Sequence, residues 1–176
     1  MSSEYLCADH STIHFAEALL ERADDFRYRL LFWYCDHARD LPWRREPTPY
    51  HVCVSEIMLQ QTRVEAVIPY YNRFLAEIPS VAALAAIGED RLLKLWQGLG
   101  YYSRVLNLKQ AAVILMEQNE GLLPHDFDRL RTLPGIGEYT AGAIASIAFG
   151  QPVPAVDGNV LRVLARLTAC TTDIRK

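Results

Sequence analysis

Apolar residues recur at the spacing of an α-helix along nearly the whole chain, and this pattern restricts the possible folds more than any other feature. The stripe formed by Phe26, Leu30, Leu31 and Tyr34 is one example. No window shows the one-by-one alternation of apolar and polar residues that a half-buried strand needs. Prolines and glycines fall between the helical segments, where they end one helix and allow a turn to the next. The pattern therefore predicts an all-α fold of helices joined by short turns.

Start and stop signals place the expected helices along the chain. Thr48 followed by Pro49 is typical of a helix cap and first turn, and Gly121 is expected to be the C-cap of a long helix. An additional surface helix is expected over residues 15–20. The other expected helices cover, approximately, residues 26–40, 48–62, 64–75, a short segment from 79, 89–96, 102–119, 126–132, 138–149 and 158–169.

The composition excludes several classes of protein. With 51% hydrophobic and 22% charged residues, the 176-residue chain has the composition of a globular protein. The longest apolar run, Ala111 to Met116, is far shorter than the ~20 residues that cross a membrane. No cationic segment followed by an apolar block opens the chain, as it would in a secretory signal. We therefore expect a soluble, cytoplasmic protein without a membrane partner.

The four cysteines give no sign of a metal site or a disulfide framework. Cys7, Cys35, Cys53 and Cys170 form no C-x-x-C pair. Buried or unreactive thiols are the favoured interpretation, and no metal is expected in this chain.

The net charge of −3 argues, at first, against a nucleic-acid partner, because lysine and arginine normally neutralise phosphates. The charge is unevenly distributed, however. Six acidic residues and one arginine lie within residues 1–25, so the rest of the chain carries a net charge of +2. This distribution is compatible with DNA binding, although it fits any soluble domain as well.

The segment Leu133-Pro134-Gly135-Ile136-Gly137 lies between two expected helices and predicts a tight hairpin. Glycines let a backbone approach a ligand closely. The amides of the hairpin and the positive end of the next helix would then form a phosphate site that needs no lysine. A plain turn between packed helices explains the pentapeptide equally well.

Two carboxylates have the setting that cleavage of a glycosidic bond requires. Glu56 shares a helix face with Val52 and Leu59, so partial burial would raise its pKa and keep it protonated as a general acid. Asp157 precedes a helix start, where it would stay ionised and stabilise a positively charged sugar. The alternatives are a solvated helix glutamate for Glu56 and an ordinary helix cap for Asp157.

Several aromatic and amide side chains fall at loops or helix ends, where they could stack on bases or read base edges. For each of them singly, packing or surface exposure is the default interpretation. They are Trp43, Tyr101, Tyr102, Tyr139, Gln60 and Gln61.

Taken together, five runs of the sequence resemble the helix-hairpin-helix DNA glycosylase superfamily, and specifically its adenine-removing MutY family. The resemblance covers about residues 26–170. Two of the runs mark the superfamily, and the S-E-I-M-L-Q-Q-T and G-L-G-Y-Y strings are more specific to the adenine enzymes. The runs are L-P-W-R at 41–44, T-P-Y-H-V-C-V-S-E-I-M-L-Q-Q-T at 48–62, L-W-Q-G-L-G-Y-Y-S-R at 95–104, L-P-G-I-G-E-Y-T-A-G-A-I at 133–144 and V-D-G-N-V-L-R-V-L at 156–164.

The resemblance implies a role for each matching residue. Glu56 is the acid that protonates adenine, Asp157 stabilises the oxocarbenium-like sugar, and the hairpin residues Leu133, Gly135, Ile136 and Gly137 bind the DNA backbone. The base pocket is lined or supported by Trp43, Arg44, Tyr139 and Asn159. Gln61 and Tyr101, with Gln60 beside them, enter the duplex. The implied reaction removes adenine paired with 8-oxoguanine or guanine from double-stranded DNA, by a monomer of the bacterial nucleoid.

The same resemblance predicts a truncated chain. Relatives continue with further helices, four clustered cysteines that hold an iron-sulfur cluster, and a domain that recognises oxidised guanine. We therefore expect an acidic extension over residues 1–25, a glycosylase region over 26–176 with an incomplete second helical lobe, and the cluster only in a full-length parent. Two alternatives stay open: a sister glycosylase for mismatched thymine or oxidised pyrimidines, and a non-catalytic DNA-binding helical module.

Overall fold

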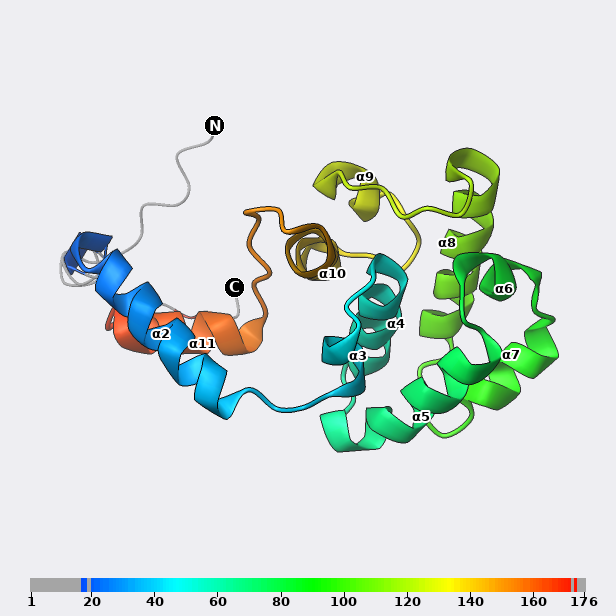
Figure 1. The fold of residues 1–176 in the computed structure, drawn as a ribbon, viewed down its shortest axis with the longest axis horizontal. Helices are drawn as coiled ribbons and strands as arrows, with labels where there is room; N and C mark the ends of the chain where they lie inside the picture. The colour runs from blue at the N-terminus through cyan, green and yellow to red at the C-terminus, as the bar shows by residue number, and fades with distance from the viewer. Residues whose placement is uncertain (1–16, 19, 172, 174–176) are drawn as a thin grey trace. The chain divides into compact units, whose positions relative to one another are not determined.

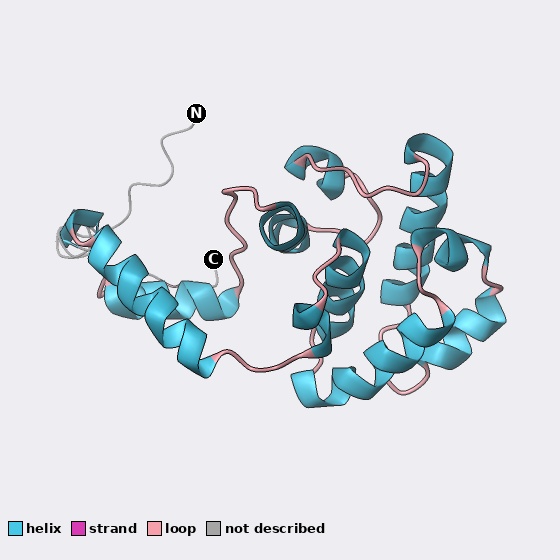
Figure 2. Ribbon diagram, viewed as in Figure 1, coloured by secondary structure: helices cyan, strands magenta, loops and turns pink. Residues whose placement is uncertain are grey.

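The computed structural model describes residues 17–18, 20–171 and 173, so most of the expected helix over residues 15–20 lies outside the described residues. Within this part of the chain every regular element is a helix (Figure 2), which confirms the predicted all-α fold. The α-helices are α2 (Ala23–His37), α3 (Pro42–Arg45), α4 (Pro49–Leu59), α5 (Val64–Glu77), α6 (Val81–Ala86), α7 (Glu89–Trp96), α8 (Ser103–Asn119), α9 (Phe127–Arg131), α10 (Glu138–Ala143) and α11 (Gly158–Leu167), with a π-helical segment, η1 (Ile144–Ala148), after α10 (Figure 1).

The chain divides into two compact units. Residues 40–155 form one of them, here called the continuous unit. Residues 1–39 and 156–176 form the other, here called the split unit because its two parts come from the two ends of the chain. The expected division into an extension of residues 1–25 and a region of residues 26–176 stays a prediction.

The hydrophobic core of the continuous unit is built around α4. Val52, Val54, Ile57 and Met58 of this helix are all buried, with side chains at most 3% exposed. The helix contacts α3, α5, α8, α10 and η1, which surround it in Figure 1. Thr48 caps its N-terminus, because its side chain accepts a hydrogen bond from the His51 amide at 3.2 Å, and Pro49 occupies the first turn. The predicted cap is thereby confirmed.

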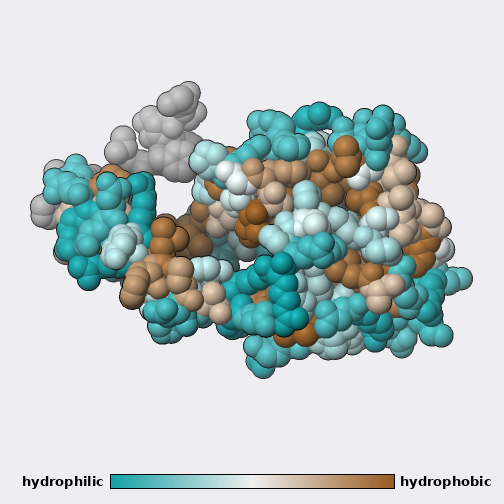
Figure 3. Space-filling view, viewed as in Figure 1, coloured by the Kyte–Doolittle hydropathy of each residue, from teal (hydrophilic) through white to brown (hydrophobic). Residues whose placement is uncertain are grey.

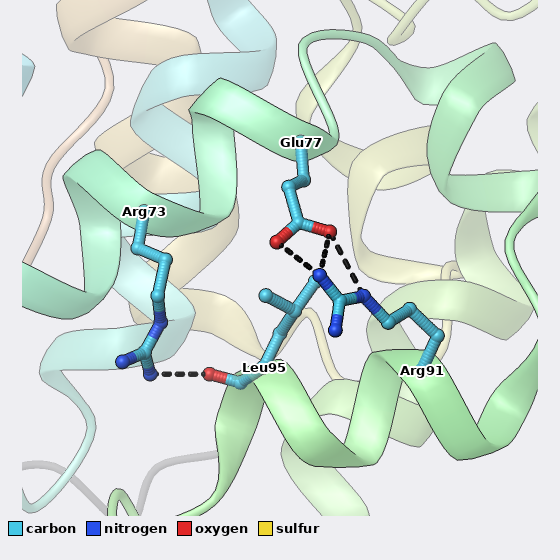
Figure 4. A network of polar contacts seen from close by, with 4 residues as sticks. All are labelled: Arg73, Glu77, Arg91 and Leu95. Carbon is cyan, nitrogen blue, oxygen red and sulfur yellow. Dashed lines mark hydrogen bonds and ion pairs between the residues drawn. The ribbon is translucent and has the colours of Figure 1, made fainter.

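Polar contacts join α5 to α7 on the surface of the continuous unit. The Arg91 guanidinium donates to both carboxylate oxygens of Glu77, with nitrogen–oxygen distances of 2.6 to 2.9 Å (Figure 4). Arg73 donates to the Leu95 carbonyl at 2.8 Å, close to the end of α7. These contacts tie α5 to α7, the helix that precedes the loop at residues 97–102.

The long helix α8 ends at Asn119, as predicted, but its C-cap is not the predicted residue. Its C-cap is Glu120, with a left-handed φ of 52°, and Gly121 follows it with φ 78°. The Gly121 amide donates to the Leu115 carbonyl at 2.9 Å, which closes the last turn. Gly121 is thus the second left-handed residue of the helix end, and its prediction as the C-cap itself was wrong.

The described helices of the split unit, α2 and α11, contain no buried residue. Charged pairs at helical spacing stabilise α2, among them Arg29 with Asp25 at 2.8 Å. Apolar side chains reach the surface of both helices, and such side chains are visible in brown in Figure 3. Among the described residues, no helix is both long and apolar enough to cross a membrane.

Candidate functional site

Glu56 lies in the second half of α4, within the continuous unit. Its neighbours Ser55 and Ile57 are 1% exposed, and Glu56 itself is half-buried. Burial raises the pKa of the Cys53 thiol to about 12, and the nearby Glu56 carboxylate adds to this effect. The structure therefore places Glu56 at the border of the core, where the sequence predicted it. Its protonation state stays a prediction.

Gln60 and Gln61 follow the last turn of α4. Gln60 lies four residues after Glu56, so the two residues lie on the same side of α4. The Gln60 side-chain amide donates to Thr140 Oγ1 at 3.5 Å, which links the end of α4 to α10. Gln61 is exposed and has a φ of 55°, a left-handed conformation that glutamine rarely adopts.

The loop at residues 97–102 has a second left-handed corner. Gly98, Gly100 and Tyr101 have φ values of 105°, 71° and 48°. Tyr101 is 63% exposed at this corner. Among the described residues, four non-glycine residues have positive φ: Gln61, Glu120 and Ala169 at the C-terminal ends of α4, α8 and α11, and Tyr101 in the loop before α8.

Arg104 joins these two corners, and sequence reasoning assigned it no role. It lies in the first turn of α8 and is 8% exposed. Nη1 lies within hydrogen-bonding distance of the carbonyls of residues 57, 58 and 60, whereas Nη2 donates to the carbonyls of Leu99 at 3.0 Å and Gly100 at 3.2 Å. Burial lowers the pKa of the guanidinium, and Tyr101 partly offsets this. The only available signal was an arginine closing the G-L-G-Y-Y-S-R run.

The predicted hairpin is present between α9 and α10. The Ile136 amide donates to the Leu133 carbonyl at 3.1 Å, with Pro134 and Gly135 at the corner of the turn. Gly135 has φ 77°, as the third residue of a type II turn requires. Leu133 and Ile136 are buried and anchor the hairpin in the core. Gly137 is exposed and is the N-cap of α10, a position without a side-chain cap.

The two glycines of the hairpin have different surroundings. A Cβ atom on Gly135 would lie 3.0 Å from Asn107 Cβ, so this glycine is required by both its φ and its contact with α8. Gly137 has a φ of −84° and open space around it. Packing within the continuous unit therefore does not require a glycine at position 137.

The predicted pocket residues of the continuous unit differ in burial. Trp43 is 7% exposed and packs edge-on against Tyr71, with ring centroids 5.3 Å apart, so it belongs to the core. Arg44 is exposed on the same short helix, α3. Tyr139 is 38% exposed in the first turn of α10, one residue before the Thr140 that contacts Gln60. Tyr102, the N-cap residue of α8, is 42% exposed.

Asp157 and Asn159 belong to the split unit. The Asp157 carboxylate caps α11 by accepting from the amides of Asn159 at 3.0 Å and Val160 at 2.8 Å. Its second oxygen accepts from the Asn159 side-chain amide at 2.9 Å. The cap interpretation is thus confirmed. The three N–H donors also fix the orientation of the carboxylate.

The described cysteines do not fit an iron-sulfur cluster. Cys53 is buried in the continuous unit, whereas Cys35 and Cys170 belong to the split unit, and Cys7 lies outside the described residues. Within the described part of the chain, no three cysteine, histidine, aspartate or glutamate side chains form a group that could hold a metal ion.

A cavity of about 750 Å³ opens at the N-terminal ends of α4 and α6. Its lining includes Tyr50, His51, His125 and Phe149. It lies at the opposite end of α4 from Gln60 and contains none of the residues that the sequence predicted for the site.

Comparison with known families and proteins gives a consistent result. The sequence model of the HhH-GPD superfamily, described as base excision DNA repair proteins, matches residues 54–176. Adenine DNA glycosylases from Mus musculus, Buchnera aphidicola and Mycolicibacterium smegmatis are 47%, 44% and 46% identical to the chain over 84%, 80% and 78% of its length. The chain spans only 30%, 41% and 47% of these relatives.

Solved structures share the fold. A thermostable thymine-DNA glycosylase superposes with a TM-score of 0.78 at 27% identity, over 84% of this chain and 68% of that one. A trapped covalent complex of endonuclease III with DNA has a TM-score of 0.73 at 25% identity, over 86% and 73% of the two chains.

Proposed function

The chain belongs to the HhH-GPD superfamily of base excision DNA repair proteins, and we propose on this basis that it removes adenine from mispairs with guanine or oxidised guanine. One observation carries this proposal: three adenine DNA glycosylases are 44–47% identical to the chain. The position of Glu56 at the border of the core agrees with it. The substrate is double-stranded DNA, and the chain acts as a monomer.

In the proposed reaction, the Glu56 carboxyl group donates its proton to a ring nitrogen of adenine. The N-glycosidic bond then breaks, and its electron pair leaves with the base. The sugar becomes positively charged, and the Asp157 carboxylate stabilises that charge. Water attacks the anomeric carbon and gives its proton to the Glu56 carboxylate, which the first step left without one, so the product is an abasic site. The three N–H donors around Asp157 support this role because they hold its carboxylate in one orientation.

DNA is proposed to contact the hairpin and both left-handed corners. The exposed Gly137, at the uncapped start of α10, offers backbone amides to a phosphate. Gln61 and Tyr101 are exposed and enter the duplex beside the extruded adenine, with Gln60 next to them. Arg44 and Tyr139 line the base pocket, Trp43 supports it from the core, and Asn159 holds Asp157.

No step above is assigned to an iron-sulfur cluster. The described cysteines do not form its ligand set, so we propose that any cluster is held by sequence outside this chain.

The alternative of a sister glycosylase is less well supported. The thymine-DNA glycosylase and endonuclease III structures share only 27% and 25% identity with the chain, against 44–47% for the adenine enzymes. A non-catalytic DNA-binding module would need the hairpin but neither Glu56 nor Asp157.

The test is a base-release assay on duplexes that contain adenine opposite guanine or oxidised guanine, with thymine–guanine and oxidised-pyrimidine duplexes in parallel. Adenine alone is expected among the released bases. Glu56→Gln keeps the shape of the side chain but has no proton to donate, so release should fall by at least ~100-fold while DNA binding persists. Release of thymine instead would favour the sister enzyme, and binding without release of any base would favour the DNA-binding module.

A further inference from the structure

Arg104 is the most heavily hydrogen-bonded side chain at the candidate site, and its surroundings are unusual for an arginine. The hydrogen-bond acceptors of its guanidinium are backbone carbonyls, apart from the Thr62 hydroxyl at 3.2 Å. Its planar group also lies over two aromatic rings, 5.4 Å from the centroid of Trp96 and 5.6 Å from that of Tyr101. A buried cation without a carboxylate partner is costly, so its retention calls for a specific explanation.

The carbonyls explain how the charge is accommodated. Those of Ile57 and Met58 belong to the last turn of α4, where carbonyls have no partner within the helix and form the negative end of its dipole. Arg104 therefore caps α4 from a different helix. Its second nitrogen, Nη2, simultaneously holds the carbonyls of Leu99 and Gly100.

Each of the two segments that Arg104 holds leads directly into a left-handed residue. Gln61 follows the Gln60 carbonyl, and Tyr101 follows the Gly100 carbonyl. For a residue with a side chain, this conformation is less stable than the right-handed one, and it persists only when the surroundings hold it. The Trp96 indole adds one such restraint by donating to the Gly100 carbonyl at 3.0 Å.

We propose that Arg104 is a positioning residue that holds Gln61 and Tyr101, before DNA arrives, in the backbone conformation in which they enter the duplex. This inference rests on the proposed function, since it assumes that these two side chains insert beside the mispair. Arg104 contacts neither base nor sugar. It acts by making the insertion surface rigid, so that binding energy is not spent on ordering it.

The variant that tests this is Arg104→Lys, because an ammonium group keeps the charge but cannot span both sets of carbonyls as the forked guanidinium does. The control is Arg73→Lys, which alters another arginine that donates to a carbonyl and lies over a ring, 4.7 Å from the centroid of Tyr70, but holds neither corner. Circular dichroism establishes that both variants are folded.

A fluorescent adenine analogue placed next to the mispair reports unstacking of the duplex. At saturating protein, Arg104→Lys should reduce this signal and slow single-turnover adenine release by about tenfold, whereas Arg73→Lys should change neither. The double variant Gln61→Ala/Tyr101→Ala provides the second measurement. In that background, Arg104→Lys should have no further effect on release, because the side chains it positions are gone.

An equal loss in both backgrounds would overturn the inference, since Arg104 would then act by another route. Wild-type unstacking and release by Arg104→Lys would overturn it too and leave the proposed function standing. If the wild-type chain unstacks the duplex but releases no adenine, the proposed chemistry fails. The unstacking signal of Arg104→Lys then still decides the role of Arg104.

Discussion

At the scale of single residues, the two glycines of the hairpin meet different requirements. Gly135 is needed for the fold, whereas Gly137 is expected to be needed for DNA binding. Gly137→Val should leave the melting temperature nearly unchanged, because φ is −84° and the surrounding space is open. It should nevertheless raise the dissociation constant for any duplex by at least ~10-fold, because the new side chain keeps phosphate away from the amides. Fluorescence anisotropy measures this.

Gly88→Val is the matched control for that prediction. Gly88 is also a glycine N-cap in open space within the continuous unit, at the start of α7. Its substitution should leave DNA affinity unchanged. Equal affinities for the Gly137 variant and the wild type would mean that the hairpin is only a turn.

Tyr139 determines the predicted product. A lysine at this position would carry an amine able to attack the sugar and form a Schiff base. A phenol cannot form an imine, so the product should be an intact strand with an abasic site. Borohydride trapping on an adenine-mispair duplex should yield no protein–DNA adduct, and gel analysis without heat or alkali should show no strand break. An efficient adduct from the unmodified chain would contradict this.

At the scale of elements, α10 owes its position to one close approach. A Cβ atom on Gly142 would lie 2.3 Å from the Pro154 carbonyl oxygen and 3.3 Å from Ala155 Cα. Gly142→Ala must therefore push apart two pieces of backbone, and it should destabilise the continuous unit by roughly 1–3 kcal/mol. Gly158→Ala is the control, since that glycine begins α11 in open space. A drop in melting temperature is expected only for Gly142→Ala, and equal melting temperatures would refute the packing argument.

The sequence predicted the helices well because most of them bury one side, and burial produces the periodicity from which they were inferred. The caps Thr48 and Asp157 were also predictable, because a side-chain oxygen before a helix start has few other roles. The short helix α3 was not predicted, since it is too short to show a period. The segment η1 lies within the helix expected over residues 138–149, but its π-helical form was not predicted.

The role of Arg104 could not be inferred from periodicity or from a cap. Its acceptors lie as many as 47 residues away in the chain, and they are carbonyls, which every residue has. Only the tertiary structure brings them together. The left-handed backbone of Gln61 and Tyr101 could not be predicted either, because neither residue type favours that conformation.

At the scale of the whole molecule, Cys53 makes stability depend on pH. Burial raises the pKa of its thiol from 9.0 to about 12 in the folded chain, so above pH 9 only the unfolded chain readily loses the proton. The free energy of unfolding should therefore fall as pH rises from 9 towards 12, by up to about 1.4 kcal/mol per pH unit from this group. Urea unfolding at several pH values measures the slope.

Cys53→Ala should flatten that slope between pH 9 and 10. Above pH 10 the buried Tyr50 and Tyr71 also contribute, because burial raises their pKa values from 10.0. Cys35→Ala, which changes an exposed cysteine, should not. If both variants keep the slope of the wild type, the thiol has no part in the alkaline loss of stability.

The split unit has a consequence for how the chain is made. A ribosome delivers residues 40–155 as one uninterrupted stretch, so the continuous unit can fold as soon as that stretch has emerged. The first part of the split unit must wait for the residues that follow position 155 before it can pack against them. In the proposed assignment, Glu56, the hairpin and both corners are therefore in place before Asp157 is synthesised. Under this proposal, a nascent chain would be able to bind DNA before it could release a base.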